Sequence, residues 1–158
     1  MINDSSLNSF AFYGHQAAAK VNAISTLYKG IQTPLDLYKA LSTIWCKETC
    51  GPALQPEWTL DNKTLGQCSI TAFLAQDIFG GDVYAMHTEN GMHCYNVVNG
   101  QCFDLTSEQF GDKARELVYT GNILQHREDA IHFAREEKFL RYKNLSELLA
   151  EFCNKKSL

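Results

Sequence analysis

No apolar run in the sequence approaches the roughly 18 residues that a membrane-spanning helix needs, so we expect no membrane segment. The polar start, Met1 to Asn8, lacks the basic-then-apolar order of a signal peptide. Basic residues are not in excess, since 14 Lys and Arg stand against 18 Asp and Glu and give a net charge of −4. A protein that binds nucleic acid normally carries a basic face. We therefore predict a cytoplasmic protein that binds neither membrane nor nucleic acid.

Repeats, low-complexity tracts and long linkers are also lacking, and the three prolines all precede residue 57. A hydrophobic content of 45% with 20% charged residues is typical of a folded protein and excludes a disordered or collagen-like chain. A chain of 158 residues is long enough for one globular domain and short for two. We therefore expect a single domain over residues 1–158.

The six cysteines show no Cys-x-x-Cys spacing and no close Cys/His pairs with the spacing of zinc ligands. They stand at positions 46, 50, 68, 94, 102 and 153. In a reducing cytoplasm we expect free thiols rather than disulfides. The spacing therefore predicts no metal site, and each cysteine has to be considered as a core residue or as a nucleophile.

Helical signals fill the first third of the chain. Apolar residues at helical spacing predict a helix over Gln16 to Tyr28, within an N-terminal helical extension of residues 1–30. Thr33 can cap a second helix, in which Pro34 suits the first position. These two helices precede the part of the chain that carries the candidate site.

A third helix is expected directly after Gly66-Gln67-Cys68. The segment Ser69 to Phe79 is apolar nearly all round, which is typical of a helix buried on most sides. Gly80-Gly81 ends it. Cys68 is therefore predicted at the N-terminus of a buried helix.

A β-meander follows, and it is the strongest local pattern in the sequence. Three short strands are expected, Val83 to His87, Met92 to Val98 and Gln101 to Leu105. They are joined by Asn90-Gly91 and Asn99-Gly100, the dipeptide that two-residue hairpin turns favour most. The pattern predicts three antiparallel strands.

Further helices are expected after the meander. Thr106 to Gln109 matches a capping box, and two helices are predicted over about Arg127 to Tyr142 and Leu145 to Cys153. The order of helices, meander and helices is typical of the α+β class.

The second turn brings a His and an Asp together. If Asn99-Gly100 is a two-residue turn, Tyr95 lies opposite Asp104, and His93 lies on the same face of the sheet as Asp104. His93 is then the diagonal neighbour of Asp104, at a Cβ separation of roughly 7 Å. His87 is expected on the other face.

Cys68 is the candidate nucleophile. The dipole and unpaired N–H groups of a helix N-terminus lower the pKa of a thiol, and a protonated His beside it lowers the pKa further. Cys68, His93 and Asp104 would then act as nucleophile, base and orienting acid. Asn62, six residues before the Cys, is a candidate donor to the oxyanion, as are the N-terminal amides of the helix.

Other interpretations of the same residues stay open. A free Cys on a buried helix is commonly a small core residue, and Asp104 could instead support a turn. A redox-sensing thiol would need a resolving cysteine near Cys68, for which Cys102 is the candidate. His126 and His132 stand among charged residues and are expected to be solvated.

A Cys at a helix start, a His on one strand and an Asp on the next resembles the transglutaminase-like and arylamine N-acetyltransferase branch of the papain-like fold. In that branch the Asp often stands in an Asp-Pro-Thr string, where this sequence has Asp104-Leu105-Thr106. Papain-like enzymes place an oxyanion Gln six residues before the Cys, where this sequence has Asn62. The resemblance implies an α+β fold in which an antiparallel meander packs on the helix that begins at the Cys.

The sequence also resembles the small bacterial YunG family over about residues 34–150. The matching strings are Trp45 with Glu48-Thr49, Gly66-Gln67-Cys68, Thr71-Ala72, Gln76-Asp77, Gly80-Gly81, His93-Cys94-Tyr95-Asn96, Asp104-Leu105-Thr106, Gln109-Phe110 and Arg141-Tyr142 with Leu145. This resemblance supports the fold and implies no substrate.

The leading expectation is a thiol-dependent enzyme of acyl transfer with a Cys68–His93–Asp104 triad. It would act on a small-molecule or peptide acyl substrate and require no cofactor. The acyl group would pass to water, as in an amidase, peptidase or deamidase, or to an amine, as in an acyltransferase. The alternative is a non-catalytic binding module of the same fold with a cleft at Cys68. An acidic surface and the N-terminal extension leave room for a homodimer.

Overall fold

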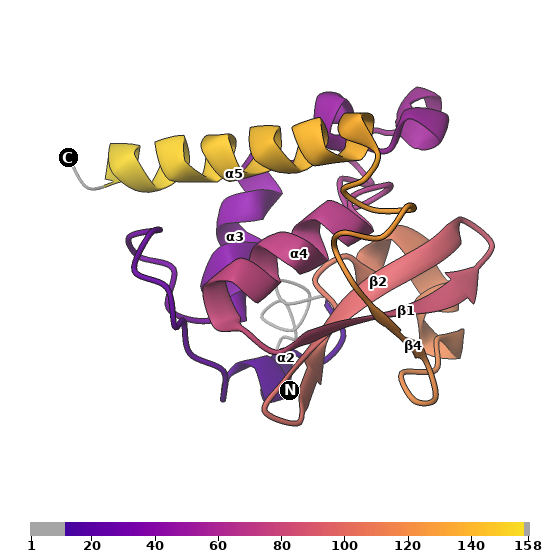
Figure 1. Cartoon of the computed structure of the whole chain (residues 1–158), viewed down its shortest axis with the longest axis horizontal. Coiled ribbons are helices and arrows are strands. Elements are labelled where there is room, and N and C mark those ends of the chain that lie inside the picture. Colours follow the sequence, from indigo (N-terminus) through magenta and orange to yellow (C-terminus); the bar gives the residue numbers. More distant parts are fainter. Residues whose placement is uncertain (1–11, 157–158) are drawn as a thin grey trace, which may run out of the picture.

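The computed structural model describes residues 12–156. Helices and turns surround one buried helix and one sheet (Figure 1). The elements are α2 (His15–Ala18), α3 (Pro34–Ile44), η1 (Lys47–Thr49), η2 (Pro52–Glu57), α4 (Cys68–Phe79), β1 (Asp82–Thr88), β2 (Gly91–Val98), β3 (Gln101–Phe103), η3 (Ser107–Glu116), β4 (Ile123–Gln125) and α5 (Glu136–Lys156). The α+β class expected from the sequence is confirmed.

The sheet is antiparallel, with the strand order β3-β2-β1-β4. The β2–β3 turn is the predicted one: Asn99 and Gly100 have φ of 50° and 78°, as a type I′ turn requires at both central positions. Val97 pairs with Cys102. The predicted register of this hairpin, on which the His–Asp argument depends, is therefore confirmed.

The first hairpin turns one residue earlier than expected. Thr88 pairs with Gly91, so Glu89 and Asn90 occupy the turn, and Gly91 follows it with a φ of 93°. Each β1 residue is thereby displaced by two positions along β2 relative to the prediction. Because side chains alternate with a period of two, a shift of two leaves every side chain on its predicted face.

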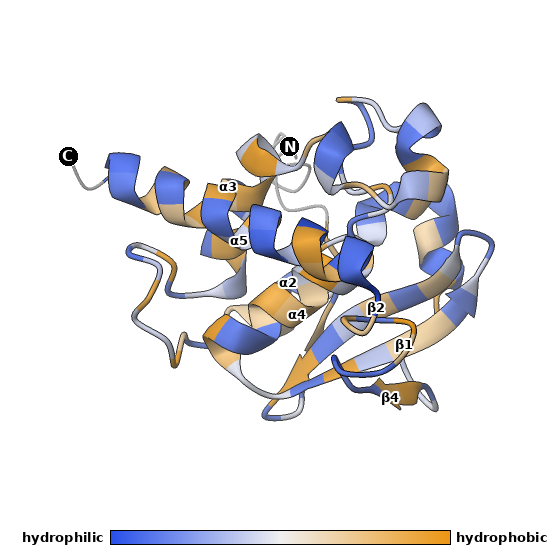
Figure 2. Ribbon diagram, turned by 45° about the horizontal axis from the view of Figure 1, so that its top comes forward, coloured by the Kyte–Doolittle hydropathy of each residue, from blue (hydrophilic) through white to orange (hydrophobic). Residues whose placement is uncertain are grey.

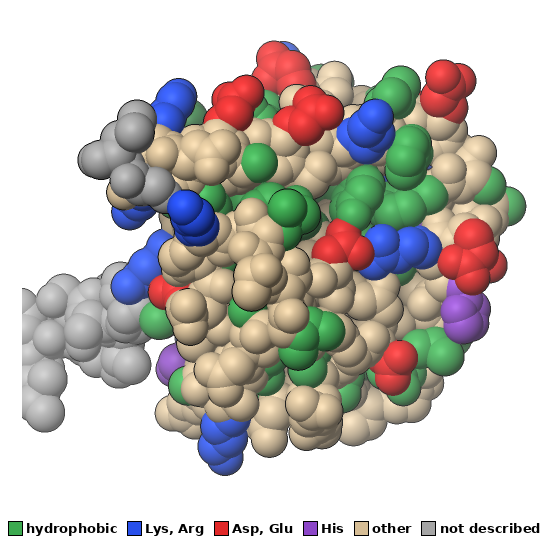
Figure 3. Space-filling model, turned by 60° about the vertical axis from the view of Figure 1, so that its left-hand side comes forward, with side chains coloured by type: hydrophobic (Ala, Val, Ile, Leu, Met, Phe, Trp, Pro, Cys, Tyr) green, Lys and Arg blue, Asp and Glu red, His purple; other side chains and the backbone are tan. Residues whose placement is uncertain are grey.

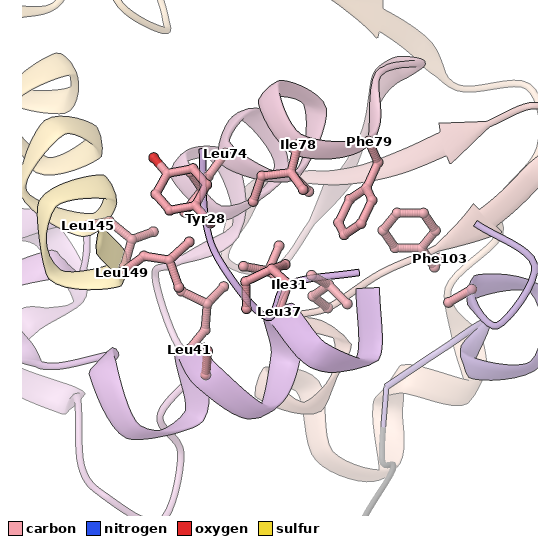
Figure 4. Close-up of a cluster of buried hydrophobic side chains, with 14 of the residues drawn as sticks. Tyr28, Ile31, Leu37, Leu41, Leu74, Ile78, Phe79, Phe103, Leu145 and Leu149 are labelled. Atoms are coloured by element: carbon pink, nitrogen blue, oxygen red, sulfur yellow. The ribbon is translucent and has the colours of Figure 1, made fainter. Parts of the chain in front are cut away.

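Helix α4 lies between the sheet and α5 (Figure 1). Most of α4 is hydrophobic, whereas α5 alternates hydrophobic and hydrophilic residues, as expected for a helix that covers a core with one side (Figure 2). Figure 4 shows side chains of α3, α4, α5 and β3 meeting in that core, with Tyr28 and Ile31 from the N-terminal segment. Burial among these elements fixes where the N-terminus of α4 lies.

The two faces of the sheet have different cover. Cys94 and Asn96 face α4, where the Asn96 side chain donates to the carbonyl oxygen of Ala72 at 2.9 Å. On the opposite face the ring of Phe110 packs edge-on against His93. Tyr119 packs edge-on against Tyr95 on that same face. Helix α4 and the predicted His93–Asp104 pair thus lie on opposite faces of the sheet.

The N-terminal segment is less helical than predicted. Helix α2 covers only His15–Ala18, and the predicted helix over Gln16 to Tyr28 is wrong. Backbone N–H groups in this segment bond to distant carbonyl groups, such as Ile24 to Ile78 at 2.8 Å, instead of continuing a helix. Residues 1–11, which include the start that was compared with a signal peptide, lie outside the described residues.

The C-terminal part also differs from the prediction. One helix, α5, replaces the second half of the predicted 127–142 helix and the predicted 145–153 helix. Residues 127–135 form turns, in which the Phe133 N–H donates to the Arg127 carbonyl at 2.8 Å. His132, expected to be solvated, is buried there and contacts Gln125 at 2.7 Å between Nε2 and Oε1.

Two capping predictions have different outcomes. At α3 the Thr33 side chain and the Asp36 carboxylate cap each other's backbone N–H groups, so this predicted helix start is confirmed. The capping box predicted at Thr106 to Gln109 is wrong, because the Thr106 hydroxyl donates to Asp104 instead.

Acidic and basic side chains are interspersed on the face drawn in Figure 3, around scattered hydrophobic side chains. Among the helices of residues 12–156, none has both the length and the apolar composition needed to cross a membrane.

Candidate active site

Cys68 is the first residue of α4, and its side chain is half-buried. The preceding residue, Gln67, does not cap the helix with its side chain, which donates instead to the Cys46 carbonyl at 3.0 Å. The first N–H groups of the helix are therefore left without a side-chain cap. The thiol of Cys68 contacts the Met92 carbonyl oxygen at 3.6 Å.

The Cys68 side chain lies near residues on both faces of β2, because the first part of this strand has no β3 neighbour. Strand β3 pairs only with residues Asn96 to Val98, so the stretch of β2 before Asn96 has no β3 neighbour. The N-terminus of α4 lies beside this open edge, as the contact between Cys68 and Met92 demonstrates. From there the thiol has His93 of one face and Cys94 of the other as neighbours.

His93 and Asp104 form a buried pair, with Nε2 of His93 2.5 Å from Oδ2 of Asp104. Both side chains are only 1% exposed. Three further donors satisfy the carboxylate: the Thr106 N–H at 3.2 Å, the Thr106 hydroxyl at 3.4 Å and the Tyr119 hydroxyl at 2.7 Å. This shell holds Asp104 in one orientation and leaves Nδ1 as the nitrogen of His93 that the carboxylate does not contact, with Gln109 Nε2 3.4 Å from it.

The electrostatics favour a charged thiolate–imidazolium pair. Burial alone would lower the pKa of His93, but the charge and hydrogen bond of Asp104, together with the Cys68 thiolate, raise that pKa to about 10. A hydrogen bond from the Cys94 thiol lowers the pKa of Cys68 most strongly. The hydrogen bond and charge of His93 lower it further, and together these outweigh burial, which acts in the opposite direction. The pKa of the Cys68 thiol is therefore well below that of an ordinary thiol.

The other cysteines with perturbed pKa values shift the opposite way. Burial raises the pKa of Cys50 and of Cys102 to about 11, and it also raises the pKa of Cys153. The hydrogen bond to Cys68 raises the pKa of Cys94 well above its ordinary value. The environment thus favours the thiolate at Cys68 and disfavours it at these four positions.

The thiol beside Cys68 is Cys94, whereas the sequence pointed to Cys102 as the candidate resolving cysteine. Cys102 pairs with Val97 and so lies on the face opposite α4. Cys94 lies on the α4 face, and the prediction placed that face away from the site. The edge position of Cys68 explains why a residue on each face can reach it.

Cys68 and His93 line a common cavity of about 170 Å³. Gln109 and Phe110 of η3 form part of its wall, and α5 contributes Lys138 and Arg141. Tyr95, which could have filled such a space, packs instead against Tyr119. The nucleophile and base candidates therefore share an open space at the N-terminus of a helix.

Asn62 is not brought to this cavity. Its side-chain amide donates to the Gln109 carbonyl at 3.4 Å, and it lines a different cavity of about 540 Å³. An isolated bridge between Thr59 and Asn62 forms a tight turn before α4, and this turn places Asn62 at the larger cavity. The larger cavity has neither Cys nor His in its described lining. The uncapped amides of α4 are thus the better-placed donors to an oxyanion.

Sequence reasoning missed Tyr119, which lies in an irregular segment without any motif. Its hydroxyl donates to Asp104, and its ring stacks on Tyr13 with 3.8 Å between ring centroids. Burial and the charge of Asp104 raise the pKa of Tyr119 well above its ordinary value. Tyr119 therefore positions Asp104 and stays protonated as a donor.

Replacing Tyr119 by Phe is expected to lower the free energy of unfolding by about 2 kcal/mol, the typical contribution of a hydrogen bond to a charged group. Urea denaturation measures the change. Tyr84→Phe is the matched control, since Tyr84 stacks near Tyr95 on the same face. A loss no larger than that of the control would contradict the role of the Tyr119 hydroxyl.

The fold and the site define an α+β protein with a thiol, an imidazole and a carboxylate gathered at one end of a sheet. A family model described as "YunG protein" matches residues 33–154, and the chain belongs to this family. This confirms the resemblance found over about residues 34–150.

The chain is also similar to "Uncharacterized protein YunG" of Bacillus subtilis (strain 168). The two are 34% identical over 98 residues, which make up 62% of this chain and 79% of the relative. No solved structure matches the chain significantly.

Proposed function

We propose that the protein is a thiol-dependent enzyme of acyl transfer that uses Cys68, His93 and Asp104. The observation that carries the proposal is the cavity shared by Cys68 and His93, with Asp104 hydrogen-bonded to the far nitrogen of the imidazole. The chain order Cys, His, Asp supports a papain-like, transglutaminase-like arrangement. Free thiols at all six cysteines fit a reducing compartment, so we place the reaction in the cytoplasm.

The proposed reaction has two steps. The Cys68 thiolate attacks the carbonyl carbon of an ester, thioester or amide, and the N–H groups of the first turn of α4 stabilise the oxyanion. His93 then gives its Nδ1 proton to the leaving group as the carbon–heteroatom bond breaks, which leaves a thioester on Cys68. In the second step His93 takes a proton from water or an amine, which attacks the thioester and releases the thiolate.

The test is covalent labelling by an activated acyl ester such as p-nitrophenyl acetate. We expect one acetyl group per chain, located on Cys68 by peptide mass spectrometry, and no such group in Cys68→Ala. Cys102→Ala is the matched control, because Cys102 is also half-buried but lies outside the cavity. If acyl compounds bind without forming an adduct, the protein is a binding module, and the proposed function is wrong.

A further inference from the structure

The cavity at Cys68 has basic residues in its wall and no acidic one. Among the described residues that line it, Lys138 and Arg141 of α5 are the charged groups besides the Cys68–His93 pair, and no Asp or Glu is present. This local excess contrasts with the net charge of −4 of the whole chain. The charge of the cavity therefore differs in sign from the charge of the protein.

The two basic residues differ in how they are neutralised. Arg141 pairs with Glu137 one turn earlier in α5 and donates to the Thr49 carbonyl at 3.0 Å. Lys138 forms no ion pair with a carboxylate within residues 12–156, and its ammonium group contacts the Ile131 carbonyl and, at 3.5 Å, Nδ1 of His132. Lys138 thus lacks a counter-charge from a carboxylate.

Lys138 lies close enough to Cys68 to respond to its charge. Burial lowers the pKa of Lys138, and negative charge on Cys68 opposes this shift. When Cys68 is acylated, its negative charge is lost and the His93 proton departs with the leaving group, so Lys138 and Arg141 are the charged groups that stay in the described wall of the cavity. An acyl group with its own negative charge would supply the carboxylate counter-charge that Lys138 lacks.

We propose, on the basis of the proposed function, that the acyl group transferred to Cys68 is short and carries a carboxylate, which Lys138 and Arg141 bind. The cavity of about 170 Å³ limits its length. At roughly 30 Å³ for each water, it has room for about six water molecules, which fits a short dicarboxylic acyl group but no long chain. Arg141 donates from Nε to Glu137 and from Nη1 to Thr49, so Nη2 is the guanidinium nitrogen that these partners leave for the carboxylate, and Lys138 supplies a point charge.

The test compares two thioesters of N-acetylcysteamine, one of glutarate and one of its neutral amide, glutaramate. They differ only in whether the far end is a carboxylate or a carboxamide. We expect the glutaryl thioester to acylate Cys68 at least 10-fold faster, with the Cys68→Ala rate subtracted as background. Lys138→Gln and Arg141→Gln are each expected to reduce this ratio at least 3-fold, whereas Lys143→Gln, an exposed residue of the same helix, leaves it unchanged.

The outcomes separate the two proposals. If neither thioester acylates Cys68, and the activated ester does not either, the proposed function fails. If Cys68 is acylated equally fast by both thioesters, the proposed function stands and the carboxylate specificity is wrong. If the preference survives in Lys138→Gln and in Arg141→Gln, the carboxylate is bound elsewhere, and the inference is overturned.

Discussion

Asp104→Asn is expected to slow the acylation of Cys68 by about 1,000-fold, because it places the imidazole proton on the wrong nitrogen. Oδ1 of Asp104 accepts two hydrogen bonds from Thr106, so the Asn carbonyl oxygen should occupy that position. The amide NH2 then replaces Oδ2 and points at Nε2 of His93. Nε2 must become an acceptor, which moves the proton to Nδ1 and removes the base that faces the cavity.

The rate of p-nitrophenolate release measures this effect, and thermal denaturation verifies that the variant is folded. Asp82→Asn is the control, since Asp82 is an exposed carboxylate at the start of β1. A folded Asp104→Asn that retains more than a tenth of the wild-type rate would show that the His93–Asp104 pair is structural. Tyr119→Phe, which removes one donor from the same carboxylate but keeps the charge, should lower this rate much less.

The pairing of His93 with Asp104 could be predicted because it depends on local rules. The Asn99-Gly100 dipeptide fixed the turn, the turn fixed the register of β2 and β3, and the alternation of side chains fixed the face. The first hairpin was predicted one residue out of place, and the error did not matter because the displacement along the strand was an even number. The start of α4 was equally local, since Gly66 and the apolar run after Cys68 defined it.

What could not be predicted depends on tertiary contacts. The sequence pattern does not indicate on which face of the sheet α4 packs. Cys94 was therefore predicted to lie away from the site, although a hydrogen bond from its thiol lowers the pKa of Cys68. Asn62 has the right separation from Cys68, but a turn before α4 directs it into another cavity. Lys138 enters the site from α5, 70 positions beyond Cys68 in the sequence, and no motif marks it.

The pairing of Cys68 with His93 predicts that His93→Gln slows alkylation of Cys68 by iodoacetamide about 10-fold at pH 6. A thiol with the ordinary pKa of about 8.5 is only about 0.3% thiolate at that pH. That fraction sets an upper limit of about 300-fold, which the lower intrinsic nucleophilicity of a low-pKa thiolate, with a Brønsted slope of about 0.45, and the remaining Cys94 hydrogen bond reduce to about 10-fold. Gln is chosen because its amide can still donate to Asp104, which would otherwise be buried without this partner.

The measurement is the alkylation rate of each cysteine from pH 5 to 10, resolved by mass spectrometry. In the wild type the Cys68 rate should reach its plateau at a lower pH than the rate of an ordinary thiol, because the pKa of Cys68 is well below its usual range. In His93→Gln the rise should move to higher pH, because the imidazolium that favours the thiolate is gone and the Cys94 hydrogen bond alone lowers the pKa less. Cys94→Ala should show a similar rise, since a hydrogen bond from Cys94 also lowers the pKa of Cys68.

A wild-type profile that rises only near pH 8.5 would show that Cys68 is an ordinary core thiol. Cys102 in the same samples gives the reference profile of a thiol with a raised pKa.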